Sequence, residues 1–174
     1  MSLAQGPGPP VTAARLDPER AVLLVVDVQE AFRKAIPDFK AIAAGAATMV
    51  AGAQAIGIPI IVTEQYPRGL GATVAEVRDH LPEGVEPIAK TKFSAAAADG
   101  FDLGGRDQVI VCGVESHVCV SQSVHDLLER GRTVHVLADA IGSRSEANRA
   151  LGLARMERAG AWPSSVEAAL FELL

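Results

Sequence analysis

The sequence contains few cysteines, few histidines and few aromatic residues. Its 174 residues include two cysteines, four histidines, five Phe, one Tyr and one Trp. Two cysteines cannot build the disulfide framework of a small secreted domain, so we expect a reducing, cytoplasmic environment. The four histidines do not cluster in the sequence, which argues against a metal site, and we expect no cofactor.

Long runs of positive charge are also missing. The net charge is −5, and no more than two Lys or Arg residues stand side by side. A protein that binds nucleic acid normally presents a basic face. We therefore expect a small-molecule substrate and no nucleic-acid partner.

Charge of either sign is missing from residues 41–63. A membrane-spanning helix needs about 20 strongly apolar residues. This stretch is mostly Ala and Gly, contains Gln54 and is broken at Gly57 and Pro59. We expect it to hold a helix followed by a buried strand, with no membrane span.

The small residues of this helix leave two interpretations open. Ile42, Met49, Val50, Ala53 and Ile56 form an apolar stripe that would face a sheet. The opposite side is uncharged as well, and it is either an exposed alanine-rich surface or a contact with another subunit, which would make the protein a homo-oligomer. The residues of this side are Ala43, Ala44, Ala47 and Ala51.

Apolar runs alternate with helix-like segments along the chain. This pattern predicts a three-layer α/β/α sandwich with a doubly wound, mainly parallel sheet of five to six strands in the order 3-2-1-4-5-6. Residues 1–18 are expected to form a flexible N-terminal segment, and residues 19–174 a single domain. The expected strands are 21–28, 58–63, 86–89, 108–112, 133–138 and 161–162; the expected helices are 38–56, 74–80, 117–130, 145–159 and 165–174, with a loop at 65–73.

Three polar residues follow strand ends, where open α/β folds bind ligands. Asp27 ends the first strand, Lys92 follows the third and Cys119 follows the fourth. A cysteine beside a helix N-terminus is biased toward the thiolate, which is the nucleophilic form. Taken singly, Cys119 could be an inert apolar residue, Asp27 a helix cap and Lys92 a surface lysine.

The remaining thiol and two nearby histidines have simpler interpretations. Cys112 lies inside a strand and is expected to be a buried structural residue. Lys90 is expected to be a solvated surface lysine. His117 and His125 stand eight residues apart on one helix, too far for chelation by residues i and i+4, so we expect no catalytic role for them.

The residues at these strand ends resemble the isochorismatase-like cysteine hydrolases. Asp27-Val-Gln29 with Phe32 is similar to the family's opening motif, Lys92-Phe-Ser-Ala95 to its lysine segment, and Gly113-Val-Glu-Ser-His-Val-Cys119 to its nucleophile segment. The resemblance covers nearly the whole chain after Pro18. The motifs stand in the family's order, which makes the combination specific.

The resemblance implies a catalytic triad of Cys119, Asp27 and Lys92. Cys119 would attack a carbonyl carbon to form a thioester, Asp27 would transfer the proton, and Lys92 would hold the Asp27 carboxylate. The family pattern also implies a cis peptide bond between Val114 and Glu115. The backbone amides of Glu115 and Cys119 would then form an oxyanion hole.

One departure from the family pattern narrows the expected function. Nicotinamidases carry metal-binding histidines after the second strand, where this chain reads Thr63-Glu-Gln-Tyr-Pro-Arg-Gly-Leu-Gly71. That stretch resembles the isochorismatase-domain-containing branch instead. We expect a metal-independent, amidase-like hydrolase with Phe32, Tyr66 and Phe93 as pocket walls. The alternatives are a non-catalytic binding or scaffold protein that retains the fold, and a redox-sensing thiol.

Overall fold

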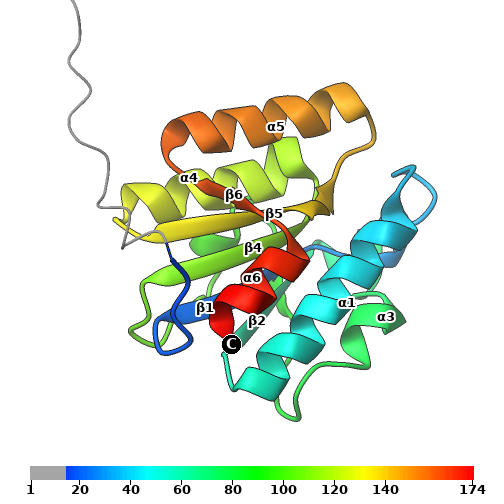
Figure 1. The fold of residues 1–174 in the computed structure, drawn as a ribbon. Helices are drawn as coiled ribbons and strands as arrows, with labels where there is room; N and C mark the ends of the chain where they lie inside the picture. The colour runs from blue at the N-terminus through cyan, green and yellow to red at the C-terminus, as the bar shows by residue number, and fades with distance from the viewer. Residues whose placement is uncertain (1–14) are drawn as a thin grey trace, which may run out of the picture.

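A single parallel sheet forms the centre of the molecule. The structure is a computed structural model that describes residues 15–174. Its six strands are all parallel and follow the order β3-β2-β1-β4-β5-β6, between two layers of helices (Figure 1). The predicted fold class and strand order are confirmed. The strands are β1 (Ala21–Val26), β2 (Ile60–Gln65), β3 (Ile88–Lys90), β4 (Gln108–Val114), β5 (Thr133–Gly142) and β6 (Trp162–Ser164).

Helices cover both faces of this sheet. The α1 and α6 helices pack on one face, and α4 and α5 pack on the other (Figure 1). Short helical turns lie in the loops at the carboxyl ends of the strands. The helices are α1 (Phe39–Ile56), α2 (Pro67–Leu70), α3 (Ala75–Arg78), α4 (Ser121–Glu129), α5 (Glu146–Ala159) and α6 (Val166–Leu173); the shorter turns are η2 (Glu30–Phe32), η3 (Ala95–Ala97) and the π-helical η4 (Ser116–Val120).

The centre of the sheet is fully buried because its strands are apolar on both sides. Every residue of β1 and of β4 is buried. The chain runs in opposite directions across the sheet from this pair, so β1 and β4 form the topological switch point where such folds bind ligands. Val26 pairs with Gly113 at the carboxyl end, which brings the residues that follow both strands to one edge.

Gly113 permits an unusually close approach of β4 to β1. Its φ is +120°, and a Cβ at this position would lie 2.0 Å from the Val26 carbonyl oxygen. Only glycine fits such a backbone position. The residue therefore fixes how the loops after β1 and β4 meet at the switch point.

Capping residues set the ends of the helices where the sequence pattern predicts them. Gly57 ends α1 with φ 85°, and Gly160 ends α5 with φ 111°. The Ser145 side chain accepts a hydrogen bond from the Asn148 amide at the start of α5. Asp38 precedes α1 but makes no side-chain capping bond.

Several predicted boundaries are wrong by a few residues, and three of the errors affect the site. The third strand extends through Lys90. The predicted loop at 65–73 contains helix α2. The helix predicted from His117 begins instead as the π-helical turn η4 at Ser116. Each error lies at or just after a strand end, where polar residues interrupt the apolar pattern.

The predicted flexible segment at 1–18 lies mainly outside the described residues. Its last part is attached to the domain. Leu16 is buried, and its backbone amide donates a hydrogen bond to Glu172 at 3.0 Å. The Asp17 amide donates to the Gln108 side chain at 2.8 Å, so the chain is held against the sheet before β1 begins.

Helix α1 is the one described helix long and apolar enough to span a membrane by length and composition alone. Its Met49 and Ala53 are buried in the core beside the sheet, as a core helix requires. The predicted small face is only partly correct, because Ala43 and Ala47 are buried. The exposed residues of the helix include Ala41, Ala44, Thr48, Ala51 and Ala55.

Candidate active site

Asp27 occupies the first position after β1, at the switch point. Its backbone has φ 52°, a left-handed conformation that is uncommon for a residue other than glycine. Its side chain is fully buried and accepts a hydrogen bond from the Thr63 hydroxyl at 2.8 Å. Strained backbone at a buried acid is typical of functional sites, where the surroundings hold it in place.

Lys90, and not Lys92, pairs with Asp27. The Lys90 Nζ lies 2.7 Å from Asp27 Oδ2 and 2.7 Å from Gln65 Oε1. It also donates to the carbonyl oxygens of Lys92 and Phe93. The Lys90 ammonium is thus buried, paired and fully hydrogen-bonded, as a buried charge must be.

The predicted position of the triad lysine is therefore wrong by two residues. Lys92 is exposed, and only its backbone carbonyl contacts the site. Lys90 pairs in register with Gln65 at the end of β3, and this pairing places its side chain under the loops. The prediction failed because a lysine that ends a short strand looks like a solvated residue in the sequence.

Cys119 lies in the π-helical turn η4, beside this ion pair. Burial and the negative charge of Asp27 raise the pKa of the Cys119 thiol to about 12, and the opposing effect of Lys90 is smaller. The prediction of a thiol biased toward thiolate is wrong for the free protein. The surroundings therefore favour the neutral thiol, and the Asp27 carboxylate lies beside it.

The segment between β4 and Cys119 contains the family's implied cis bond. The peptide bond between Val114 and Glu115 is cis. The Glu115 carbonyl accepts hydrogen bonds from the amides of Val118 and Val120, which closes the turn around Cys119. The Glu115 side chain is buried and points to the exposed Arg144, whose backbone amide donates to it at 2.9 Å.

A cavity of about 510 Å³ opens above Cys119. This is the size of a pocket for a small molecule. Phe32 and Phe93 line it, as predicted, and Phe93 is half exposed at the rim. Tyr66 does not line it and instead belongs to a neighbouring cavity. The full lining of the Cys119 cavity is Ala31, Phe32, Ala35, Gln65, Leu70, Phe93, Glu115, Val118, Cys119 and Arg144.

Gln29 is a site residue to which the sequence argument gave no role. Its fully buried side chain donates to the carbonyl oxygens of Gln65 and Gly71 and accepts from the Gln65 amide. Three hydrogen bonds from one amide group hold both ends of the loop after β2. The signal in the sequence was a glutamine three residues after a buried strand, where an unpaired amide would be costly.

Helix α5 packs tightly against the turn that carries Cys119. A Cβ on Gly152 would lie 2.7 Å from the backbone carbon and oxygen of Ser116. Ser143 further links this turn to β5, because its hydroxyl lies 2.8 Å from the Ser116 hydroxyl and 3.0 Å from His117 Nδ1. His117 therefore supports the turn through a hydroxyl and does not contact the ion pair.

The other predicted structural residues occupy simple positions. Cys112 is fully buried inside β4, and burial raises its pKa to about 12. His125 bonds to the backbone carbonyl of Ser121 within α4. Within residues 15–174, no three His, Cys, Asp or Glu side chains come together in a way that could hold a metal ion.

The fold and the site together define a class of protein: a doubly wound α/β protein with a thiol, a carboxylate and a lysine at its switch point. The chain belongs to the isochorismatase family, because the model of the isochorismatase domain matches residues 21–168. It therefore has the fold of a hydrolase family.

Similar proteins agree with this assignment. The chain is 41% identical to isochorismatase domain-containing protein 2A of Mus musculus, over 92% of this chain and 78% of that protein. The structure of MAR1 ribonuclease from Caenorhabditis elegans matches with a TM-score of 0.87 and 41% identity, over 92% and 84% of the two chains. YcaC from Escherichia coli, an octameric hydrolase of unknown specificity, matches with a TM-score of 0.82 and 28% identity, over 95% and 83%.

Proposed function

We propose that the protein is a cysteine hydrolase that acts on a small amide-type or related carbonyl compound through a thioester acyl-enzyme. The observation that carries this proposal is the meeting of Cys119, Asp27 and Lys90 at the switch point, with Cys119 lining a cavity. A buried lysine and a buried aspartate could form a purely structural ion pair. A thiol beside the pair, open to a cavity of about 510 Å³, supplies the group that a structural pair would not need.

The reaction begins from the neutral thiol. As the Cys119 sulfur attacks the substrate carbonyl carbon, its proton passes to the Asp27 carboxylate. The tetrahedral intermediate collapses to a thioester, and Asp27 gives the proton to the departing amine. Water then attacks the thioester while Asp27 accepts one of its protons; the C–S bond breaks, Asp27 returns the proton to the Cys119 sulfur, and the acid product and the free thiol are released. None of these steps uses a metal or a cofactor.

Lys90 has two roles in this scheme. It fixes the orientation of the Asp27 carboxylate through the bond at 2.7 Å. Its positive charge lowers the cost of thiolate character on Cys119 as the proton leaves, since Lys90 acts on the pKa of Cys119 in that direction. The Thr63 hydroxyl completes the support of Asp27 from β2.

Hydrogen-bond donors must stabilise the negative charge that develops on the substrate oxygen. We assign this role to the backbone amides of Glu115 and Cys119, which lie on the two sides of the turn after β4. Loss of one such donor typically costs about 10²–10³ in rate. Phe32 and Phe93 would then set the apolar width of the pocket.

The test is a turnover screen with small amides, ureas, carbamoyl compounds and esters. The wild type should hydrolyse at least one class, and the acyl-enzyme should appear as a mass increase on Cys119. Cys119→Ala should abolish both signals. Cys112→Ala is the matched control, because it removes the second thiol from the core and should leave turnover in place. Turnover that survives in Cys119→Ala would overturn the mechanism.

A non-catalytic scaffold and a redox-sensing thiol are the alternatives. The raised pKa of Cys119 counts against a redox sensor, because such sensors oxidise readily through the thiolate. A scaffold needs no ordered proton acceptor beside a thiol, whereas this chain places Asp27 there. The screen above separates these alternatives from a hydrolase.

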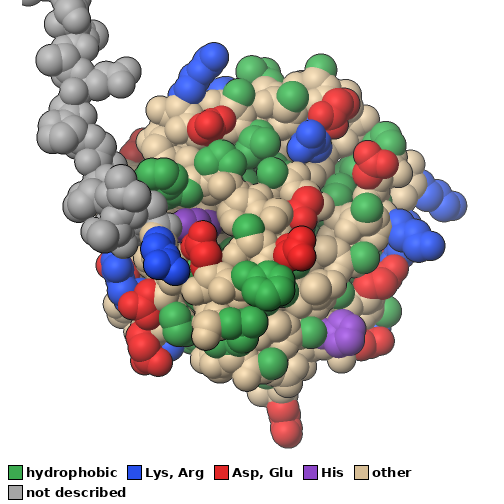
Figure 2. Space-filling model, in the orientation of Figure 1, with side chains coloured by type: hydrophobic (Ala, Val, Ile, Leu, Met, Phe, Trp, Pro, Cys, Tyr) green, Lys and Arg blue, Asp and Glu red, His purple; other side chains and the backbone are tan. Residues whose placement is uncertain are grey.

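Hydrolysis of RNA is a further alternative because one similar structure is named a ribonuclease. The net charge of −5 does not favour a polyanion, and acidic and basic side chains are mixed on the face shown in Figure 2. A binding assay with labelled RNA at low and high salt would detect such an activity. We expect no saturable binding.

We also propose a homo-oligomer in the cytoplasm. The support is an octameric relative and the uncharged exposed strip of α1, which lies beside α6 with its exposed Phe171. Light scattering at working concentration should give more than one chain per particle. Ala51→Glu, which adds a charge to the strip, should shift the particle toward the monomer, and a monomeric wild type would contradict the proposal.

A further inference from the structure

A second cavity lies on the other side of the loop that bounds the Cys119 cavity. Its volume is about 460 Å³. No residue lines both cavities. Gln65 and Phe93 line the Cys119 cavity, whereas their chain neighbours Tyr66 and Lys92 line the second one. The two cavities are therefore back to back. The lining of the second consists of Tyr66, Pro67, Arg68, Ala89, Lys90, Thr91, Lys92, Ala97, Ala98 and Asp99.

The charges of this second cavity are unbalanced. The Asp27 carboxylate already pairs with the Lys90 ammonium, which leaves Arg68 and Lys92 as the available cations. Both are exposed, and neither forms an ion pair within residues 15–174. Asp99 is the one acid in the lining. The cavity thus favours an anion.

Tyr66 gives the cavity an aromatic wall. Its backbone has φ 38°, an uncommon conformation for a bulky residue, and its amide is fixed by a hydrogen bond to the Lys90 carbonyl at 2.8 Å. The residue is 55% exposed, so no core packing explains its position. It lies over Gly69, where a Cβ would come within 2.5 Å of the ring.

The need for a turn does not explain why a tyrosine stands at position 66. A turn that needs positive φ is normally made by Gly, Asn or Asp, which adopt it at lower cost. Here a tyrosine takes the position, and the residue three places later has no side chain, which leaves room for the ring. Backbone strain of this kind is kept where a side chain has a function.

We propose that this cavity is a second binding site, specific for a small aromatic anion. The ring of the ligand would stack on Tyr66, and its carboxylate or phosphate would bind Arg68 and Lys92. A volume of about 460 Å³ is sufficient for one such molecule. Lys90 lines this cavity as well as pairing with Asp27, but ligand binding requires neither Cys119 nor turnover and can be measured separately from the proposed reaction.

Tyr66 provides a direct readout because it is the one tyrosine of the chain. Protein labelled with 3-fluorotyrosine therefore gives a single ¹⁹F resonance that reports on this cavity. Titration with phenyl phosphate should move the resonance in a saturable manner. The Cys119→Ala protein should give the same curve, which separates this result from the outcome of the hydrolysis tests.

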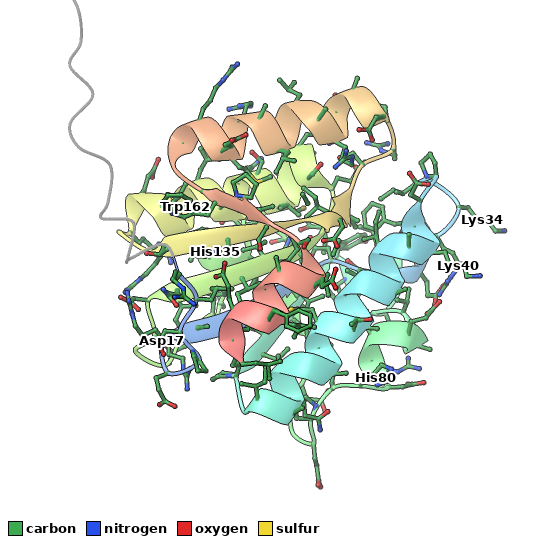
Figure 3. All side chains as sticks on the ribbon, in the orientation of Figure 1. Asp17, Lys34, Lys40, His80, His135 and Trp162 are labelled. Atoms are coloured by element: carbon green, nitrogen blue, oxygen red, sulfur yellow. The ribbon has the colours of Figure 1, made fainter. Side chains whose placement is uncertain are left out.

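Variants and analogues test each part of the site. Arg68→Gln combined with Lys92→Gln should weaken binding about tenfold or more, since a tenfold change corresponds to about 1.4 kcal/mol. Lys40→Gln is the matched control, because Lys40 is an exposed lysine of α1 that projects outward (Figure 3). Cyclohexyl phosphate and inorganic phosphate, which cannot stack, should bind more weakly than phenyl phosphate.

Three results would overturn the proposal. The first is the absence of a saturable shift at millimolar phenyl phosphate. The second is an equal affinity in the Arg68→Gln, Lys92→Gln protein, which would indicate non-specific contact. The third is loss of the shift in Arg144→Gln, because Arg144 lines the Cys119 cavity and such a loss would place the ligand there.

Discussion

The Nζ of Lys90 lies 2.7 Å from Oδ2 of Asp27, and both side chains are almost completely buried. A buried ion pair is stabilising only while both partners are present, because each alone is an uncompensated charge. Here the pair also carries the proposed proton transfer. The same contact therefore affects both stability and activity, and experiments must separate the two.

The lysine at the end of β3 is the first point to test. Lys90→Met should abolish turnover and lower the free energy of unfolding by about 3–5 kcal/mol, because it leaves Asp27 buried without a partner. Lys92→Met should change neither, since the Lys92 side chain is exposed. Activity measurements and urea unfolding on both variants check this.

A double variant separates the two roles of the pair. Asp27→Asn with Lys90→Met removes both charges, so its stability should recover toward that of the wild type while turnover stays absent. Recovery of activity together with stability would mean that the pair only supports the fold.

The pH dependence of Cys119 alkylation is the second test. The charge of Asp27 raises the pKa of Cys119, so Asp27→Asn should lower that pKa and increase the thiolate fraction at any given pH. Iodoacetamide should then react at lower pH than in the wild type, whose alkylation should rise only in strongly alkaline solution. Hydrolysis should fall about 10²–10⁴-fold in the same variant. Mass spectrometry after proteolysis distinguishes Cys119 from Cys112, and an unchanged or raised alkylation midpoint would contradict the assignment of Asp27.

The close packing of α5 on the turn that carries Cys119 gives a third test. Gly152→Ala would bring a methyl group within 2.7 Å of the Ser116 backbone, so the turn must shift. We expect a loss of about 1–3 kcal/mol of stability and a lower kcat in the protein that remains folded. Leu151→Ala is the control, because its side chain is exposed on the same helix. Unchanged kcat in Gly152→Ala would show that the position of this turn does not depend on α5.

Substitutions at two glycines distinguish the cost of backbone strain from the cost of a steric clash. Gly113→Ala should cost about 3 kcal/mol or more, because it combines positive φ with a clash against Val26. Gly57→Ala has positive φ but open space around it, and should cost about 1–2 kcal/mol. Thermal unfolding of both variants measures the difference. Similar costs would mean that β1 and β4 can separate without penalty.

Local sequence patterns were sufficient to predict the fold and part of the candidate site. The unbroken apolar runs of β1 and β4 identified the parallel sheet, and the polar residues that follow them identified Asp27 and Cys119. Each of these two signals depends on a single strand and its end. The sequence therefore contained enough information to place the switch point.

The rest of the site depends on contacts between segments that are distant in the sequence. Lys90 is buried only because β3 pairs with β2 and the loop carbonyls of Lys92 and Phe93 close over it. The pKa of Cys119 depends on how deeply its turn is buried, which neighbouring sequence does not show. Tyr66 follows a strand end but faces a different cavity, because its left-handed backbone turns the ring away.

The three hydrogen bonds of Gln29 have a consequence for how this scaffold can change. They anchor Gln65 and Gly71, so the chain between these two residues is tied down at both ends independently of its own composition. Substitutions between 66 and 70 can therefore reshape the wall shared by both cavities without moving Asp27 or Lys90. The amide of one buried glutamine thus separates the segment that lines the two cavities from the buried pair of Asp27 and Lys90, and it leaves the first free to diversify.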